Sequence, residues 1–222
     1  MNKYIDDLNK IILEKIDKIR YSDEKKTFDV PQAVTIGWDN VLADPPTNGS
    51  ETTKKELIYI SELTRSLSNS QIDLIKLVDA NPNLLYHKTL KKHRLEFPYD
   101  IFGRAWDVMS PVIKNLKYKF NRPRPYQLAP IYDIKIKVTQ TSTHHTPAYP
   151  SGHTAYAALG AYILSAKYPE YSFEFFSEVS LAGVARILQG VHYPSDNEAS
   201  MIISGAVWEN IRYELFPELR NF

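Results

Sequence analysis

Apolar residues recur at helical spacing through most of this 222-residue sequence, and this pattern most restricts what the chain can fold into. An α-helix patterned in this way has one face that must be buried against other elements. We therefore predict an all-α protein, a single helical-bundle domain. The clearest helical patterns cover residues 98–120, 152–167, 173–189 and 196–215.

Local signals set the expected helix ends. Thr53 and Glu56 fit a capping box for a helix that runs to about residue 67. A second helix is expected from Ser70 and should stop before Pro82. Pro111 predicts a kink or a break within residues 98–120.

Alternating apolar residues over 134–138 indicate either a short strand or an extended arm.

Composition excludes several classes of protein. The chain has 27 Lys and Arg against 26 Asp and Glu, so nothing favours a general nucleic-acid surface. It has no cysteine, which excludes disulfides and thiolate chemistry. The longest nearly apolar run, about residues 154–166, is too short to span a bilayer. The N-terminus carries acidic residues and has no uninterrupted apolar run, so we expect no signal peptide and a soluble, cytoplasmic protein.

The most apolar helix is preceded by Pro150 and Ser151 and begins with Gly152 and His153. These are ordinary turn and helix-start residues, so His153 could be a surface side chain. Alternatively, the turn holds an anion against the helix N-terminus with His153 beside it.

Two cations lie near a proline-rich segment. Lys117 and Arg124 are seven residues apart, about two helical turns, and could share a side. Pro123 disfavours a helix through Arg124, so we expect that arginine on a stiff extended segment. The segment is either a solvated basic loop or part of an anion site.

A third motif contains Arg186, His192 and Asp196. Arg186 and His192 would not share a face of one ideal helix. Gly190 is a plausible helix C-cap that lets the chain bring His192 back beside Arg186. Asp196 could then accept a hydrogen bond from one imidazole nitrogen of His192, leaving the other nitrogen free to attack.

Together the three motifs supply what phosphoryl transfer needs. Lysine and arginine neutralise phosphate oxygens, backbone donors at a helix start add to that cradle, one histidine attacks and another protonates the leaving oxygen. Lys117-x6-Arg124-Pro125, Pro150-Ser151-Gly152-His153 and Arg186-x5-His192-x3-Asp196 resemble the three-part signature of the type 2 phosphatidic acid phosphatase and vanadium haloperoxidase superfamily.

The resemblance implies a role for each matched residue. His192 would be the nucleophile that forms a phosphohistidine, and Asp196 would orient it. His153 would be the general acid and then the base that activates water. The phosphate would be held by Lys117, Arg124, Ser151, Gly152 and Arg186.

The resemblance implies a soluble, acid-phosphatase-like phosphomonoesterase that acts on a small phosphorylated substrate without a metal or other cofactor. A vanadium-dependent haloperoxidase would use the same residues, with vanadate on His192, and the motifs do not separate the two. A third hypothesis is a non-catalytic, oxyanion-binding helical domain.

The resemblance also suggests how the chain is organised. Residues 1–40, with an amphipathic helix over 4–21 and a connector, would be peripheral to a helical catalytic domain at 41–222. We expect no nucleic-acid partner and no integral membrane segment. Soluble relatives are often homo-oligomers, so a homo-oligomer is an expectation by analogy. His144 and His145 either line the rim of the pocket or lie in an exposed polar loop.

Overall fold

The computed structural model describes residues 2–31 and 36–217, and within these residues it contains helices and no strand. The prediction of an all-α protein is therefore confirmed. The α-helices are α1 (Asn2–Asp17), α2 (Trp38–Val41), α3 (Glu51–Thr64), α4 (Asn69–Ala80), α5 (His87–His93), α6 (Tyr99–Phe120), α7 (Pro125–Leu128), α8 (Gly152–Lys167), α9 (Ser172–Leu188) and α10 (Pro194–Leu215). Three short 3₁₀ helices are η1 (Pro82–Tyr86), η2 (Ala129–Tyr132) and η3 (Pro169–Tyr171).

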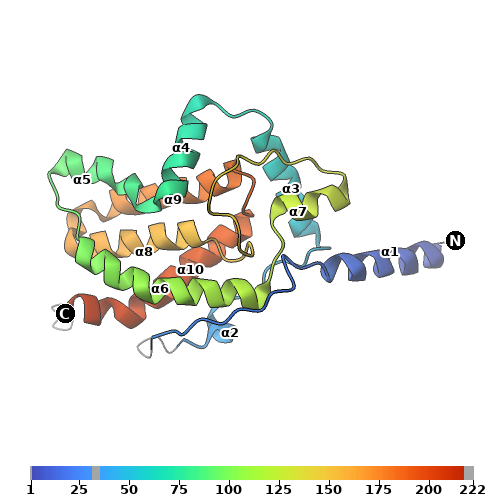
Figure 1. Ribbon diagram of the computed structural model, residues 1–222, viewed down its shortest axis with the longest axis horizontal. Helices are drawn as coiled ribbons and strands as arrows, with labels where there is room; N and C mark the ends of the chain where they lie inside the picture. Colours follow the sequence, from blue (N-terminus) through green and yellow to red (C-terminus); the bar gives the residue numbers. More distant parts are fainter. Residues whose placement is uncertain (1, 32–35, 218–222) are drawn as a thin grey trace.

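Helix α8 forms the centre of the bundle and packs against α6, α9 and α10 (Figure 1). Its alanines allow the neighbouring helices to approach closely, and Ala157, Ala158 and Ala161 are fully buried. A helix that is apolar on nearly all sides is stable only when it is surrounded in this way. Because α8 begins at Gly152, His153 lies in its first turn, at one end of the bundle.

Helix α6 is continuous from Tyr99 to Phe120, so of the kink or break predicted at Pro111 the break is wrong, and the kink stays a prediction. A proline inside a helix costs about 3 kcal/mol because it removes a hydrogen bond and crowds the preceding turn. Met109, Val112 and Ile113 are buried on either side of it. Their packing against the core offsets that cost.

Helix α3 begins two residues before the predicted cap. Ser50 is the N-cap, and its hydroxyl accepts a hydrogen bond from the Thr53 amide at 3.2 Å. Thr53 is buried inside the helix and donates its own hydroxyl to the Thr47 carbonyl at 2.8 Å. The box predicted from Thr53 and Glu56 is therefore wrong, because Glu56 belongs to a different polar network.

The next helix, α4, is capped by Ser68 with a reciprocal contact from Gln71. It ends before Pro82, as predicted. Residues 134–138 form the extended arm rather than a strand. The arm is held by side chains, for example by the Thr64 hydroxyl, which accepts from the Lys137 amide at 3.3 Å.

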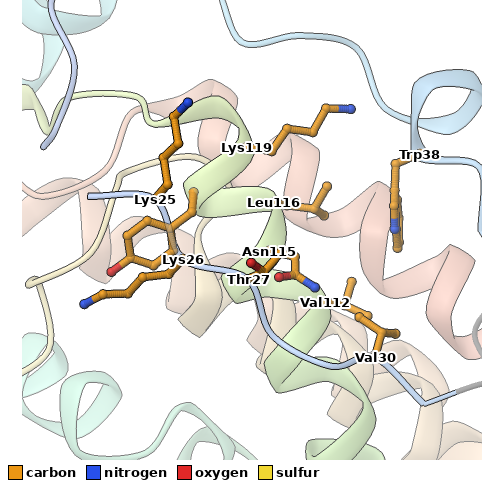
Figure 2. Close-up of a pocket in the computed structure, with 10 residues that line it drawn as sticks. Lys25, Lys26, Thr27, Val30, Trp38, Val112, Asn115, Leu116 and Lys119 are labelled. Atoms are coloured by element: carbon orange, nitrogen blue, oxygen red, sulfur yellow. The ribbon is translucent and has the colours of Figure 1, made fainter. Parts of the chain in front are cut away.

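Helix α1 projects from the bundle and ends at Asp17, four residues earlier than predicted (Figure 1). The connector after it lies along α6, where Asn115 exchanges two hydrogen bonds of 2.7 Å with the backbone of Phe28. A groove of about 630 Å³ lies beside this connector, with Lys25 and Lys26 near one end and Trp38 at the other (Figure 2). None of the predicted site residues lines this groove. The division of the chain at residue 40 stays a prediction.

Candidate active site

The three sequence motifs meet at one small cavity of about 150 Å³. It lies between the C-terminal half of α6, the start of α8, the end of α9 and the segment before α10. Residues from each motif face it, although up to 75 positions separate them in the chain (117 to 192). The predicted residues that line it are Lys117, Arg124, Gly152, His153, Arg186 and His192.

His192 is held by the carboxylate of Asp196. Nδ1 of His192 lies 2.9 Å from Oδ2 of Asp196, and the same oxygen accepts the Tyr193 amide at 3.0 Å. The carboxylate therefore keeps the proton on Nδ1 and leaves Nε2 with a lone pair. Nε2 lies 2.8 Å from Nη1 of Arg124, which donates to it.

The turn after α9 brings His192 into this position. Gly190 has a φ of 80°, which is the left-handed region that favours glycine. The Gly190 amide donates to the Ile187 carbonyl at 2.9 Å, and the Val191 amide donates to the Arg186 carbonyl at 3.3 Å. These two bonds close α9 with a Schellman motif, so the role predicted for Gly190 is confirmed.

Lys117, Arg124 and Arg186 are all buried around the cavity. Nζ of Lys117 donates to the Pro147 carbonyl at 2.6 Å. Burial, and then the charge of Arg124, hold the pKa of Lys117 well below its ordinary value. Burial and the charge of Arg186 lower the pKa of Arg124 to about 10. Burial is the larger cause of both shifts, and repulsion from the neighbouring cations adds to it, so an anion bound among them would be strongly stabilised.

Asp79 holds Arg186 and was missed in the sequence. Its Oδ1 accepts from Nη1 of Arg186 at 2.8 Å and also from the hydroxyls of Thr141 and Thr143. Burial raises the pKa of Asp79, but the bonds from Thr143, Thr141 and Arg186 outweigh it and lower the pKa to about 2. Asp79 lies 107 residues before Arg186, and no local motif marks it.

His153 faces the cavity from the first turn of α8. Its Nε2 lies 3.4 Å from the backbone carbonyl of Asp79, to which it donates. Burial, and then the charge of Arg186, lower the pKa of His153 to about 3. The pKa of His192 is likewise held well below its ordinary value, by burial and then by Arg124.

Ser151 and Gly152 differ in their access to the cavity. Gly152 lines it, whereas Ser151 is fully buried beneath it. The Ser151 amide donates to the Asp196 carbonyl at 3.1 Å, and its hydroxyl lies 3.0 Å from that of Thr154. The structure thus shows Ser151 joining α8 to the start of α10, and its contact with phosphate stays a prediction.

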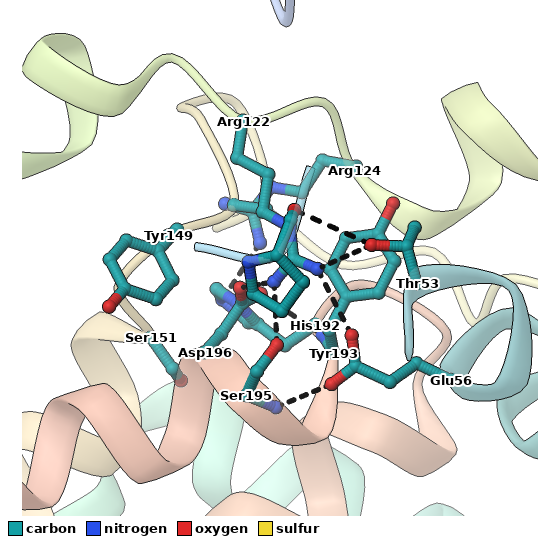
Figure 3. A network of polar contacts seen from close by, with 12 residues as sticks. Thr53, Glu56, Arg122, Arg124, Tyr149, Ser151, His192, Tyr193, Ser195 and Asp196 are labelled. Atoms are coloured by element: carbon teal, nitrogen blue, oxygen red, sulfur yellow. Dashed lines mark hydrogen bonds and ion pairs between the residues drawn. The ribbon is translucent and has the colours of Figure 1, made fainter. Parts of the chain in front are cut away.

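A buried ion-pair network behind Asp196 was also missed (Figure 3). Nη1 of Arg122 donates to Oδ1 of Asp196 at 2.6 Å, and Nη2 donates to Oε2 of Glu56 at 3.0 Å. Oε1 of Glu56 accepts the Ser195 amide at 2.7 Å, and the Arg122 guanidinium lies 3.7 Å from the centre of the Tyr193 ring. The network ties α3 to the start of α10.

His144 is buried, and His145 is exposed. The His144 ring lies between the rings of Tyr126 and His145, with centroids 6.0 and 4.9 Å away. Its neighbours Thr143 and Thr146 line the cavity. His144 is therefore packed at the rim, while His145 is part of an exposed loop.

Two further observations concern metals and membranes. Within residues 2–31 and 36–217, no three His, Cys, Asp or Glu side chains gather as a metal site. In the same part of the chain, no helix has the length and apolar character needed to cross a bilayer.

Comparison with known proteins places the part of the chain that carries the cavity in a known family. The model of the PAP2 superfamily matches residues 108–217, which include all eight predicted site residues. A non-specific acid phosphatase of Salmonella typhi is 40% identical over 121 residues, 51% of this chain and 47% of that protein. One of Providencia stuartii is 33% identical over 95 residues, 42% of this chain and 38% of that protein. The matched region thus spans less than half the length of either relative.

The fold is shared with a bacterial vanadium-dependent chloroperoxidase. The apo structure of that protein superposes with a TM-score of 0.56 over 86% of this chain and 55% of the other. Sequence identity is 11%, so this likeness concerns the fold alone.

Proposed function

Because residues 108–217 of this chain belong to the PAP2 superfamily, we propose that the protein is a phosphomonoesterase that acts through a phosphohistidine on His192. One observation carries the proposal. A neutral imidazole, held by Asp196 through Nδ1, lies in a small cavity with three buried cations and a second histidine. The acid-phosphatase relatives support the class of reaction.

Binding follows from charge. A phosphate dianion among Lys117, Arg124 and Arg186 relieves the repulsion between these cations. The start of α8 at Gly152 adds backbone donors and the positive end of the helix dipole. Arg124 would transfer its hydrogen bond from Nε2 of His192 to a phosphate oxygen, which frees the lone pair on Nε2.

In the first step, Nε2 of His192 attacks phosphorus, and the bond from phosphorus to the ester oxygen breaks. The leaving oxygen takes a proton from His153. The resulting N-phosphoimidazolium keeps its proton on Nδ1 and donates it to Asp196. The negative charge of Asp196 stabilises the imidazolium. In the second step, His153 removes a proton from water as the water attacks phosphorus. The bond to nitrogen breaks, and phosphate is released.

His153 must be protonated for the first step, although its pKa is lowered to about 3. A phosphate dianion beside it offsets the charges of Arg186 and Lys117, which both lower that pKa. Substrate binding should therefore be coupled to proton uptake. A monoanionic substrate would bring the proton itself.

Hydrolysis of p-nitrophenyl phosphate by metal-stripped protein tests the proposal. Lys117, Arg124 and Arg186 supply the positive charge, so chelators should leave the rate unchanged. Vanadate resembles the transition state and should inhibit competitively at micromolar concentration. The same residues would hold vanadate in a haloperoxidase. Rapid bromination of a phenol dye with vanadate and peroxide, with negligible hydrolysis, would favour that activity instead.

A further inference from the structure

A cleft lies beside the catalytic cavity, and many of the side chains that line it are aromatic. This cleft, of about 420 Å³, is lined by Phe102, Gly103 and Trp106 of α6 and by Asn81, His87 and Phe97 from the segments before it. None of the described residues that line it is Lys, Arg, Asp or Glu. Trp106 is 40% exposed and Tyr99, also in the lining, is 73% exposed, so aromatic surface faces solvent here.

The cleft and the catalytic cavity share a wall. Trp106 of the cleft stacks on Tyr156, with ring centroids 3.5 Å apart and planes within 13°. Tyr156 in turn lines the catalytic cavity. The end of α4 also lies near both, because the Asp79 carbonyl contacts His153 and Asn81, two residues later, lines the cleft.

The direction of the proposed reaction places the leaving group on this side. In phosphoryl transfer the attacking and leaving atoms are roughly in line, so the leaving oxygen points away from His192 and towards the acid that protonates it. That acid, His153, contacts the end of α4 at which the cleft begins. The catalytic cavity, at about 150 Å³, is smaller than the 300–1,000 Å³ typical of ligand pockets. A large leaving group must therefore extend beyond it.

We infer that the cleft binds the leaving group, and that the preferred substrates are phosphomonoesters of flat, uncharged aromatic groups. The inference rests on the proposed function. Trp106 and Phe97 offer ring faces and edges for offset or edge-to-face packing against such a group. The described lining has no Lys, Arg, Asp or Glu, so it offers no permanent counter-ion to a charged alcohol.

Gly103 allows the cleft to be filled without disturbing the catalytic cavity. Gly103 lines the cleft, and a Cβ atom placed on it meets no atom within 4 Å, so this position has room for a larger side chain at the edge of the cleft. Gly103→Leu would occupy space needed by the leaving group. Gly103→Ala is the matched control, because it gives a similar gain in helix propensity and adds only one methyl group.

The experiment compares kcat/KM for 1-naphthyl phosphate and ethyl phosphate in the wild type and both variants. Gly103→Leu should lower kcat/KM for 1-naphthyl phosphate by about tenfold or more, through KM, and leave ethyl phosphate unchanged. Gly103→Ala should leave both values unchanged. Adenosine 5′-monophosphate is the third substrate. If Gly103→Leu also lowers kcat/KM for this substrate, the class of leaving groups that the cleft binds includes nucleosides.

Two results would overturn the inference in different ways. If Gly103→Leu changes hydrolysis of 1-naphthyl and ethyl phosphate by the same factor, the cleft does not bind the leaving group, although the phosphatase proposal stands. If the wild type hydrolyses none of the three substrates, the proposed function fails and the inference fails with it.

Discussion

Arg122 binds the carboxylate oxygen of Asp196 that His192 does not use. Oδ1 of Asp196 accepts from Arg122 at 2.6 Å, while Oδ2 lies 2.9 Å from Nδ1 of His192. Both oxygens are fixed, so the imidazole has one orientation. Arg122 also draws electron density from the carboxylate, which weakens the attraction of Asp196 for a proton on His192.

Replacing Arg122 by Met should therefore affect both chemistry and stability. Removal of one partner of a buried ion pair costs about 3–5 kcal/mol, because Asp196 and Glu56 lose their shared cation. Loss of a nearby positive charge should also raise the pKa of His192, and the acidic limb of the kcat/KM profile should move to higher pH. A fall in kcat/KM with an unmoved pH profile would show that Arg122 has a purely structural role.

The ion pair between Asp79 and Arg186 predicts a pH-dependent stability. The pKa of Asp79 is lowered from 3.8 to about 2 in the folded protein, so its contribution is present above about pH 4. That contribution is lost as the pH falls through about 2. Urea unfolding should show wild type more stable than Asp79→Asn at pH 5, with the difference shrinking between pH 4 and pH 2. A difference that is constant over this range would contradict the assignment.

His153 should matter most for poor leaving groups. The His153→Ala protein lacks the proton donor, and general acid assistance is typically worth about 10²–10⁴-fold. Formation of the phosphoenzyme should slow by that order with an alkyl phosphate and by less with p-nitrophenyl phosphate, whose leaving group needs little protonation. Pre-steady-state kinetics with both substrates measures this ratio. If the substitution slows phosphoenzyme formation equally with the two substrates, His153 is not the general acid.

Gly190 is expected to tolerate no side chain. Its φ of 80° is strained for other residues, and a Cβ atom there would lie 2.8 Å from Cγ2 of Ile136. Gly190→Ala should lower the free energy of unfolding by about 1–3 kcal/mol and reduce activity by displacing His192. Gly103→Ala is the control, since its Cβ meets no atom within 4 Å and should be neutral or stabilising. Equal stability of the two variants would argue against strain at Gly190.

The sequence predicts the site better where the contacts are local. The spacing between His192 and Asp196 and the turn at Gly190 predicted a real hydrogen bond and a real helix cap. Three separated motifs meet in one cavity, as their resemblance to a known signature implied. The contact between Arg122 and Glu56 spans 66 residues, so no local pattern could reveal it.

The errors in the fold prediction have two different physical origins. Local propensity suggested a kink or a break at Pro111 and a cap at Thr53, and the structure has neither the break nor that cap. At Pro111, buried neighbours keep the helix intact. At Thr53, the residues before it provide a better cap in Ser50, which frees Glu56 to bind Arg122. The aromatic cleft beside the cavity combines residues from 81 to 106 and has no sequence signature.

The most direct test of the proposed mechanism is rapid-quench trapping of the phosphoenzyme from ³²P-labelled substrate in metal-stripped protein. Phosphohistidine is labile in acid and stable in base, so the label can be assigned chemically and then located by peptide mapping. We expect wild type to carry the label on His192, His153→Ala to retain it longer because water is no longer activated, and His192→Ala to carry none. Label on the His192→Ala protein, or on a residue other than His192 in wild type, would contradict the mechanism.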